Sequence, residues 1–205
     1  MRSTPDPVMI LQKARLQETL GRPFIFIHVN KCGGTSVASA LDILQIHGPV
    51  QTWLELYGRE FVAAKRSFSV VRRPYERLCS MFRFRSSRGV AVYEGRNLEL
   101  NEWIYRTLHL KDPGLVRIAR MLTPAHEWML DANGDNLVEL VVRLEDIDKD
   151  WGKVQQLTGC KAGLPRLNTT HATPDTSVHA LNSESRAIIE REFEADFQAF
   201  DYDHL

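Results

Sequence analysis

The sequence has no excess of charge of either sign, because its 26 basic and 26 acidic residues give a formal net charge of zero. A general nucleic-acid binder holds phosphates with a surplus of Lys and Arg, so the balance argues against that class of protein. Local basic clusters are still possible. The composition, 43% hydrophobic and 25% charged, is typical of a globular protein, and 205 residues are most simply one domain.

Long apolar runs are also missing. No run approaches the ~18 residues of a membrane-spanning helix, so we expect no transmembrane anchor. The N-terminal stretch lacks the uninterrupted apolar core and the cleavage site of a secretory signal. It predicts instead a short amphipathic helix from about Pro7 to Leu20, ended by Gly21 and Pro23.

Cysteine is scarce. The chain has three cysteines, odd in number and far apart, at Cys32, Cys79 and Cys160. They offer neither a disulfide framework nor the spacing of a zinc site, and no acidic cluster has metal-ligand spacing. We therefore expect no metal, and a reducing, cytoplasmic location.

The sequence does contain an alternation of short apolar runs and helical patterns. Three runs predict buried strands, at 24–29, 67–71 and 137–144. Helical patterns separate them, one over 35–46 and another starting at Pro74, a residue favoured at the first helical position. Further helical patterns cover TWLELYGREFVAAK, LNEWIYRTL, DIDKDWGKVQQLTG and SESRAIIEREFEADF. Strands joined through helices need crossover connections, so we predict an α/β fold with a central parallel sheet covered by helices.

The stretch NKCGGTS at 30–36 follows the first predicted strand. Gly33 and Gly34 let backbone N–H groups close on a ligand, and the start of the next helix favours an anion. Lys31 adds a positive charge, so the loop suits a phosphate or sulfate group. A tight strand–helix turn would explain the glycines equally well.

This loop differs from the common nucleotide-binding motifs. A Walker A loop has its lysine after the glycines, whereas Lys31 precedes them, and the dinucleotide fingerprint G-x-G-x-x-G is absent. A cysteine-based phosphatase would need an arginine where this chain has Ala38.

A second phosphate-binding candidate follows the second predicted strand, in VVRRPYERLCS at 70–80. Arg72 leaves the strand at the sheet edge where ligands bind in such folds, and Ser80 lies two turns into the next helix. A guanidinium is a rigid fork that suits phosphate oxygens, and a serine hydroxyl adds a donor. A single arginine at a strand end is more often a surface residue. The indication of a binding site comes from the occurrence of this arginine together with the first loop.

Together, FIFIHVNKCGGTS and FSVVRRPYERLCS resemble the two cofactor motifs of the carbohydrate-type (family 2) sulfotransferases, which use 3′-phosphoadenosine 5′-phosphosulfate (PAPS). The first is similar to P-K-T-G-G-T-S and the second to V-R-[DN]-P-x-x-R-x-x-S. The resemblance extends over about 22–203, through regions such as LPRLNTT and FEADFQAFDY. It implies a P-loop-like three-layer fold in a single domain, with 1–21 as an N-terminal helix.

The resemblance also implies roles for residues of this chain. The 5′-phosphosulfate would contact Lys31, Cys32, Gly33, Gly34, Thr35 and Ser36. The 3′-phosphate would be held by Arg72 and Ser80, and Asn168 lies in a late loop that approaches the nucleotide in this family. Three positions depart from the pattern, at Asn30, Cys32 and Arg73. Cys32 offers no hydroxyl, and Arg73 is expected to add charge beside the 3′-phosphate.

Transfer to an acceptor hydroxyl calls for a base that titrates near neutral pH. In this family a histidine often lies after the first helix, which points to His47, and Lys31 is expected to stabilise the leaving oxygen. His28, within a strand, is expected to be a core residue. The alternative bases left open are His109, His126, Glu55 and Glu102.

Other side chains have two interpretations. The stretch FRFRSSRG contains three arginines, Arg83, Arg85 and Arg88. They either contact an anionic ligand or lie at a solvated helix end, where arginine is favourable. Trp53, Trp103 and Trp128 are expected in the core rather than at a sugar, and Asp146 as a helix cap or structural partner.

The predicted function is transfer of a sulfuryl group from PAPS to a hydroxyl of a carbohydrate or related small molecule, by in-line displacement without a metal. Two alternatives stay open. One is a nucleotide kinase, which would need Mg²⁺, and the other is a catalytically silent nucleotide-binding or interaction module of the same fold. The acceptor pocket is expected within 83–132, and its acceptor is not identified by the sequence.

Overall fold

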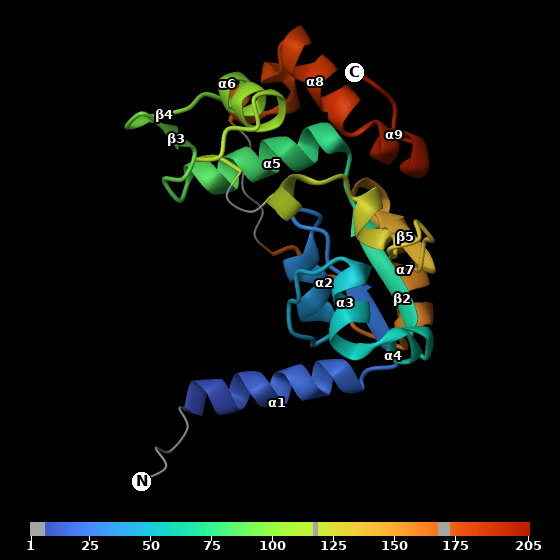
Figure 1. The fold of residues 1–205 in the computed structure, drawn as a ribbon. Coiled ribbons are helices and arrows are strands. Elements are labelled where there is room, and N and C mark those ends of the chain that lie inside the picture. The colour runs from blue at the N-terminus through green and yellow to red at the C-terminus, as the bar shows by residue number, and fades with distance from the viewer. Residues whose placement is uncertain (1–6, 117–118, 168–172) are drawn as a thin grey trace.

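The computed structural model describes residues 7–116, 119–167 and 173–205. Its centre is a parallel three-stranded sheet in the order β1-β2-β5, flanked by helices (Figure 1). The strands are β1 (Phe24–Ile27), β2 (Arg66–Val71) and β5 (Leu140–Arg143). Phe26 lies beside Phe68, which in turn lies beside Leu140. The predicted α/β class, with a central parallel sheet covered by helices, is confirmed.

The helices are α1 (Pro7–Gly21), α2 (Gly34–Ala40), α3 (Val50–Tyr57), α4 (Arg59–Ala63), α5 (Pro74–Ser86), α6 (Leu100–Ile104), α7 (Ile147–Thr158), α8 (Ser183–Glu192) and α9 (Glu194–Phe200). A π-helical turn, Tyr105–His109, continues α6. A small antiparallel hairpin joins β3 (Val92–Tyr93) to β4 (Arg96–Asn97). The 3₁₀ turns are Ala119–Leu122, His126–Met129, Leu144–Asp146, Pro174–Thr176 and Val178–Ala180.

Strands β1 and β2 are buried along almost their whole length, as expected for a parallel sheet covered on both faces, whereas β5 is mostly half-buried. The two serines of β2 are satisfied within the sheet, because Ser69 Oγ donates to the Ile27 carbonyl and Ser67 Oγ to that of Leu137, each at 2.8 Å. The first and third strands are shorter than predicted. After β1 the Val29 N–H bonds back to the Ile27 carbonyl, and before β5 the Leu137 N–H bonds to Met129.

Several helices also end earlier than their patterns predict. The pattern over 35–46 stops at Ala40, because Asp42 takes a left-handed conformation with φ +48°. The pattern over 52–65 is divided into α3 and α4 at Gly58, where φ is +84°. The last pattern divides at Phe193 into α8 and α9. In each case the apolar periodicity continues across a backbone break.

Helix α1 lies below the rest of the molecule in Figure 1 and contacts it through its C-terminal half. Lys65 Nζ donates to the Leu20 carbonyl at 2.9 Å, Arg15 pairs with Asp42, and Thr19 Oγ1 accepts the Leu44 N–H. Across the described residues, no helix has both the length and the apolar character to cross a membrane.

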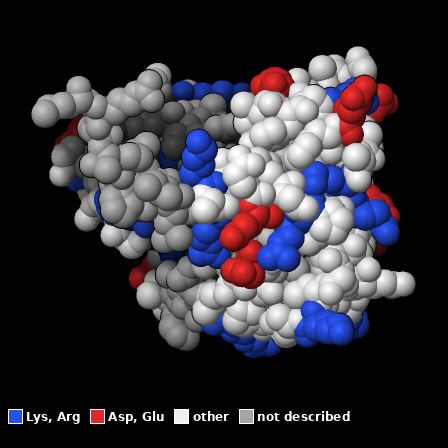
Figure 2. All heavy atoms as spheres, turned by 90° about the horizontal axis from the view of Figure 1, so that it is seen from below, with Lys and Arg blue, Asp and Glu red and all other residues white. Residues whose placement is uncertain are grey.

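The core lies between the sheet and its helices. It includes all three tryptophans predicted there, Trp53, Trp103 and Trp128, which are buried. The surface seen from below the view of Figure 1 carries Lys and Arg among uncharged residues, with Asp and Glu between them (Figure 2). On this face the charges are mixed, in line with the zero net charge.

Candidate functional site

A cavity of about 990 Å³ opens at the carboxyl ends of the strands. Its walls come from the loop after β1 with the start of α2, from Arg72 after β2 with one face of α5, from residues after β5, and from 164–167. The two predicted motifs therefore meet in one cavity. Of the predicted site residues, those that line it are Lys31, Gly33, Gly34, Thr35, Ser36, His47, Arg72 and Ser80. Asn168 lies outside the described residues.

The loop at 30–36 needs its two glycines for different reasons. Gly33 has φ +74°, and a side chain there would also lie 2.7 Å from the Leu144 side chain. Gly34 packs against His28, whose Nε2 would lie 1.7 Å from any Cβ at position 34. Lys31 is left-handed as well, with φ +62°, although it is not glycine. The tertiary contacts of this loop must therefore hold a conformation that lysine adopts at some cost.

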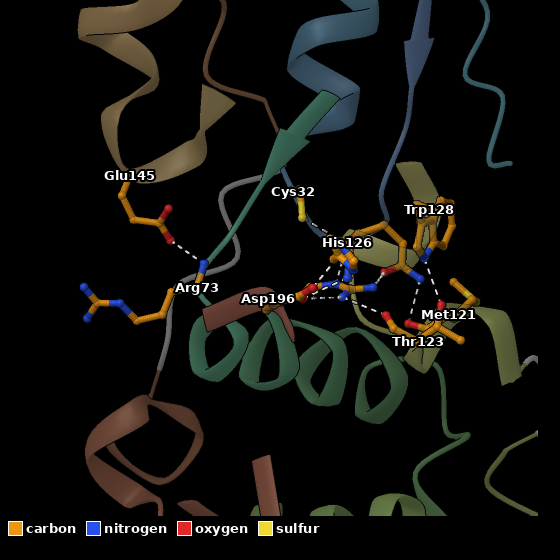
Figure 3. A network of polar contacts seen from close by, with 11 residues as sticks. Cys32, Arg73, Met121, Thr123, His126, Trp128, Glu145 and Asp196 are labelled. Atoms are coloured by element: carbon orange, nitrogen blue, oxygen red, sulfur yellow. Dashed lines mark hydrogen bonds and ion pairs between the residues drawn. The ribbon is translucent and has the colours of Figure 1, made fainter. Parts of the chain in front are cut away.

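A buried polar network holds the start of this loop (Figure 3). Arg77 on α5 is 2% exposed and donates to Asn30 Oδ1 at 3.0 Å and to the Asn30 carbonyl at 3.4 Å. Asn30 Nδ2 donates in turn to the Met121 carbonyl at 2.9 Å. Asn30, which departs from the family pattern, thus uses its amide to connect the loop to α5 and to the 3₁₀ turn at Ala119–Leu122.

The same network continues to the C-terminal helix α9. Arg77 Nη1 donates to the Thr123 carbonyl at 2.9 Å and lies 3.8 Å from the carboxylate of Asp196, which is fully buried. Asp196 accepts the backbone N–H groups of Ala125 and His126, each at 2.8 Å. Burial raises the pKa of Asp196, and the Arg77 charge opposes that rise. Sequence reasoning missed Arg77, although a charged residue within the apolar pattern of α5 was a signal for a buried partner.

Cys32 does not bring its side chain to the cavity. It is 1% exposed, and its Sγ donates to the Asn30 carbonyl at 3.4 Å. Burial raises the pKa of this thiol to about 12, so it stays protonated. If Cys32 contacts a ligand as predicted, it can do so only through its backbone N–H group.

The two neighbouring arginines after β2 point in different directions. Arg72 lines the cavity and its Nη1 donates to the Lys31 carbonyl at 3.5 Å, so it links the two motifs. Arg73 points away: its backbone N–H donates to Glu145, and its guanidinium lies 3.9 Å from Glu76 (Figure 3). The expectation that Arg73 adds charge beside the 3′-phosphate is not supported, because its side chain is not among the residues that line the cavity.

One face of α5 and the turn after it form another wall of the cavity. The residues that line it there are Ser80, Arg83 and Phe84 on the helix, and Ser87 and Arg88 in the turn. Arg85, on the other face, is buried and donates to the Leu115 carbonyl. The arginines of FRFRSSRG therefore divide between the cavity and the core.

The cavity is strongly cationic. Lys31, Arg72, Arg83 and Arg88 all line it, and within the described ranges none of the four pairs with a carboxylate. A fifth cation, Arg166, pairs with Asp148 at 2.6 Å. Burial and the charges of Arg72 and Arg83 lower the pKa of Lys31. This arrangement is set up for a ligand that carries several negative charges.

Two histidines lie at the cavity in ring contact, with 4.0 Å between the centroids of His28 and His47. His28 is 3% exposed and stacks on Phe26, as expected for a core residue. Burial, and the neighbouring His47, lower the pKa of His28 to about 3, so it is neutral at physiological pH. His47 is exposed to the cavity.

The alternative bases lie elsewhere. His109 stacks on Tyr105 and His126 contacts Asp196 through its backbone. Glu102 bonds to Arg96 and Arg106, which hold its pKa at about 2, and Glu55 accepts from Gln51. None of these four lines the cavity. Asp146 makes no side-chain cap and instead pairs with Arg143 at 2.8 Å. Among the described residues, no cluster of three His, Cys, Asp or Glu side chains could hold a metal.

Comparison with known proteins shows which family the sequence matches. The sequence profile of the sulfotransferase family matches residues 21–203. No curated protein matches the chain. Among solved structures, a sulfotransferase from Alicyclobacillus acidocaldarius is 15% identical, with 88% of this chain and 99% of that chain covered and a TM-score of 0.43.

Proposed function

Because this chain belongs to the sulfotransferase family, we propose that it transfers a sulfuryl group from PAPS to a hydroxyl of a carbohydrate or a related small molecule. The observation that carries the proposal is the meeting of Lys31 and Arg72, from two separate motifs, at one cationic cavity. The two anionic ends of PAPS, its 5′-phosphosulfate and its 3′-phosphate, call for two such groups of donors.

In this proposal the loop after β1 holds the 5′-phosphosulfate, through Lys31 and the backbone of Cys32, Gly33, Gly34, Thr35 and Ser36. Arg72 and Ser80 hold the 3′-phosphate, and the family resemblance alone assigns Asn168 to the nucleotide. The positive charges at the cavity, which pair with no carboxylate in the described part of the chain, support this assignment, because PAPS brings several negative charges. The cavity volume of about 990 Å³ also suits a ligand of nucleotide size together with a small acceptor.

The reaction is an in-line displacement at sulfur. The acceptor oxygen forms the new S–O bond while the bond from sulfur to the bridging phosphate oxygen breaks, and adenosine 3′,5′-bisphosphate leaves. Lys31 stabilises the negative charge that develops on the bridging oxygen. His47 takes the proton of the acceptor hydroxyl, since it is the candidate base that lies exposed at the cavity.

A first test is binding of adenosine 3′,5′-bisphosphate, followed by thermal unfolding. At about 100 times Kd, the ligand should raise Tm by roughly 5–10 °C. Arg72→Ala should weaken its binding about 10- to 100-fold, because a charge-assisted contact to the 3′-phosphate is lost. Arg73→Ala is the matched control, since the adjacent arginine lies outside the cavity wall and should leave binding unchanged. Stabilisation by ATP with Mg²⁺ instead would favour the nucleotide kinase.

A second test separates catalysis from binding. His47→Ala should lower kcat about 100-fold or more, as loss of a general base does, and should leave adenosine 3′,5′-bisphosphate binding unchanged. The measurement is transfer of labelled sulfate from PAPS to an acceptor found by screening hydroxyl compounds. His109→Ala, at an exposed histidine outside the cavity wall, is the control. Wild-type turnover by His47→Ala would show that another group is the base, and nucleotide binding without turnover on any acceptor would favour the silent module.

A further inference from the structure

The amine of Lys31 does not point freely into the cavity but lies over an aromatic ring. Its Nζ is 4.4 Å from the centroid of Phe84 on α5. Phe84 is half-buried and lies one helical turn beyond Ser80, on the face of α5 that lines the cavity. The guanidinium of Arg88, one turn further on, lies 4.5 Å from the same ring.

We propose that Phe84 is a positioning residue that fixes the place of the Lys31 amine at the cavity wall. The inference rests on the proposed function for its catalytic meaning, because Lys31 is there the group that stabilises the leaving oxygen. The contact between the amine and the ring can be measured without any turnover.

The charges around Lys31 explain why a positioning residue is needed. Arg72, Arg83 and Arg88 all repel the Lys31 ammonium group and would favour its flexible side chain turning out to water. Within the described residues no carboxylate pairs with it. The face of an aromatic ring attracts a cation through its quadrupole, so Phe84 counters the repulsion.

An aromatic ring also holds the cation without neutralising it. A carboxylate in the place of Phe84 would pair with Lys31 and cancel the charge that the phosphosulfate needs, and it would repel the anionic donor. The ring leaves the full positive charge available at the loop. The choice of phenylalanine at this position therefore suits a lysine that must be both held and free to act on an anion.

The chain offers a matched control in a second lysine–phenylalanine pair. Lys65 Nζ lies 4.7 Å from the centroid of Phe61, away from the residues that line the large cavity. Protons over a ring face are shifted upfield by the ring current, so the ε-CH₂ signals of both Lys31 and Lys65 should lie upfield in NMR spectra of the labelled protein. Phe84→Leu should move only the Lys31 signal, and Phe61→Leu only that of Lys65. A Lys31 signal at the ordinary lysine position in the wild-type protein would overturn the inference.

Kinetics test the consequence for catalysis. With PAPS saturating, Phe84→Leu should lower kcat about two- to thirtyfold, the range of a lost cation–π contact. The affinity for adenosine 3′,5′-bisphosphate should fall by no more than the roughly three- to tenfold expected when Lys31 itself is removed. Phe84→Tyr keeps the ring face and should keep kcat, and Phe61→Leu should leave kcat unchanged. Weaker nucleotide binding with an unchanged kcat would overturn the inference, because the ring would then hold the nucleotide. A wild-type protein that shows the Lys31 ring shift but transfers no sulfate would contradict the proposed function and leave the contact between Phe84 and Lys31 standing.

Discussion

Replacing Lys31 with alanine is expected to lower kcat by about 10²- to 10³-fold, the usual loss when a group that stabilises transition-state charge is removed. Lys31 lies at the cavity where the two motifs meet, and among the described residues no other lysine lines that cavity. Binding of adenosine 3′,5′-bisphosphate should weaken less, by about three- to tenfold, because the product keeps its other contacts. Transfer of labelled sulfate and calorimetric titration measure the two effects.

The control for this change is Lys161→Ala, at an exposed lysine outside the cavity wall, which should leave both quantities unchanged. Lys31→Arg keeps the charge but replaces a compact ammonium group with a wider fork, so partial activity is expected. If Lys31→Ala weakened binding and left kcat unchanged, Lys31 would serve binding alone. A kcat near that of the wild type would contradict its role at the leaving oxygen.

Arg77→Met is expected to lower the free energy of unfolding by about 3–5 kcal/mol, the cost of breaking a buried ion pair on one side. The substitution would leave the buried carboxylate of Asp196 without its cation and would remove the donors to Asn30 and Thr123. The loss is large against the roughly 5–15 kcal/mol that stabilises a typical domain. Urea unfolding at neutral pH provides the measurement.

Arg85→Met on the same helix is the matched control, because Arg85 is also buried but, within the described residues, donates to the Leu115 carbonyl alone. Its expected cost is smaller, about 1–3 kcal/mol for a carbonyl left without its donor. Equal losses in the two variants would mean that the contacts of Arg77 to Asn30 and Asp196 add nothing beyond a single hydrogen bond. In a folded Arg77→Met protein, weaker adenosine 3′,5′-bisphosphate binding is also expected, since Asn30 starts the loop that carries Lys31.

The sheet and the two motifs were readable from the sequence because they depend on local patterns. Apolar runs separated by helical patterns require crossover connections, which predicts the parallel sheet observed for β1, β2 and β5 but not the order of its strands. Parallel strands bring their carboxyl ends to one edge, so Lys31 and Arg72 had to approach each other although 41 residues separate them. The family followed from the same two motifs and is confirmed over 21–203.

The boundaries of the elements were less predictable. The break at Asp42 ends α2 early, and the apolar pattern gives no sign of this, because Leu41 and Ile43 on either side of the break are both buried. Asp42 also forms an ion pair with Arg15 of α1, a long-range contact that no local pattern in the sequence predicts.

The amino-acid sequence by itself determined the fold class, the family and the edge of the sheet where the cavity lies. Each of these follows from residue type and spacing along one strand or helix. Which side chains reach that cavity was decided in three dimensions. Arg72 and Arg73 are adjacent in sequence, yet only Arg72 lines the cavity, because the chain turns between β2 and α5. The Cys32 side chain packs into the network of Arg77 and Asn30, and the Lys31 amine lies over the ring of Phe84. These arrangements depend on contacts between distant segments, which residue spacing does not encode.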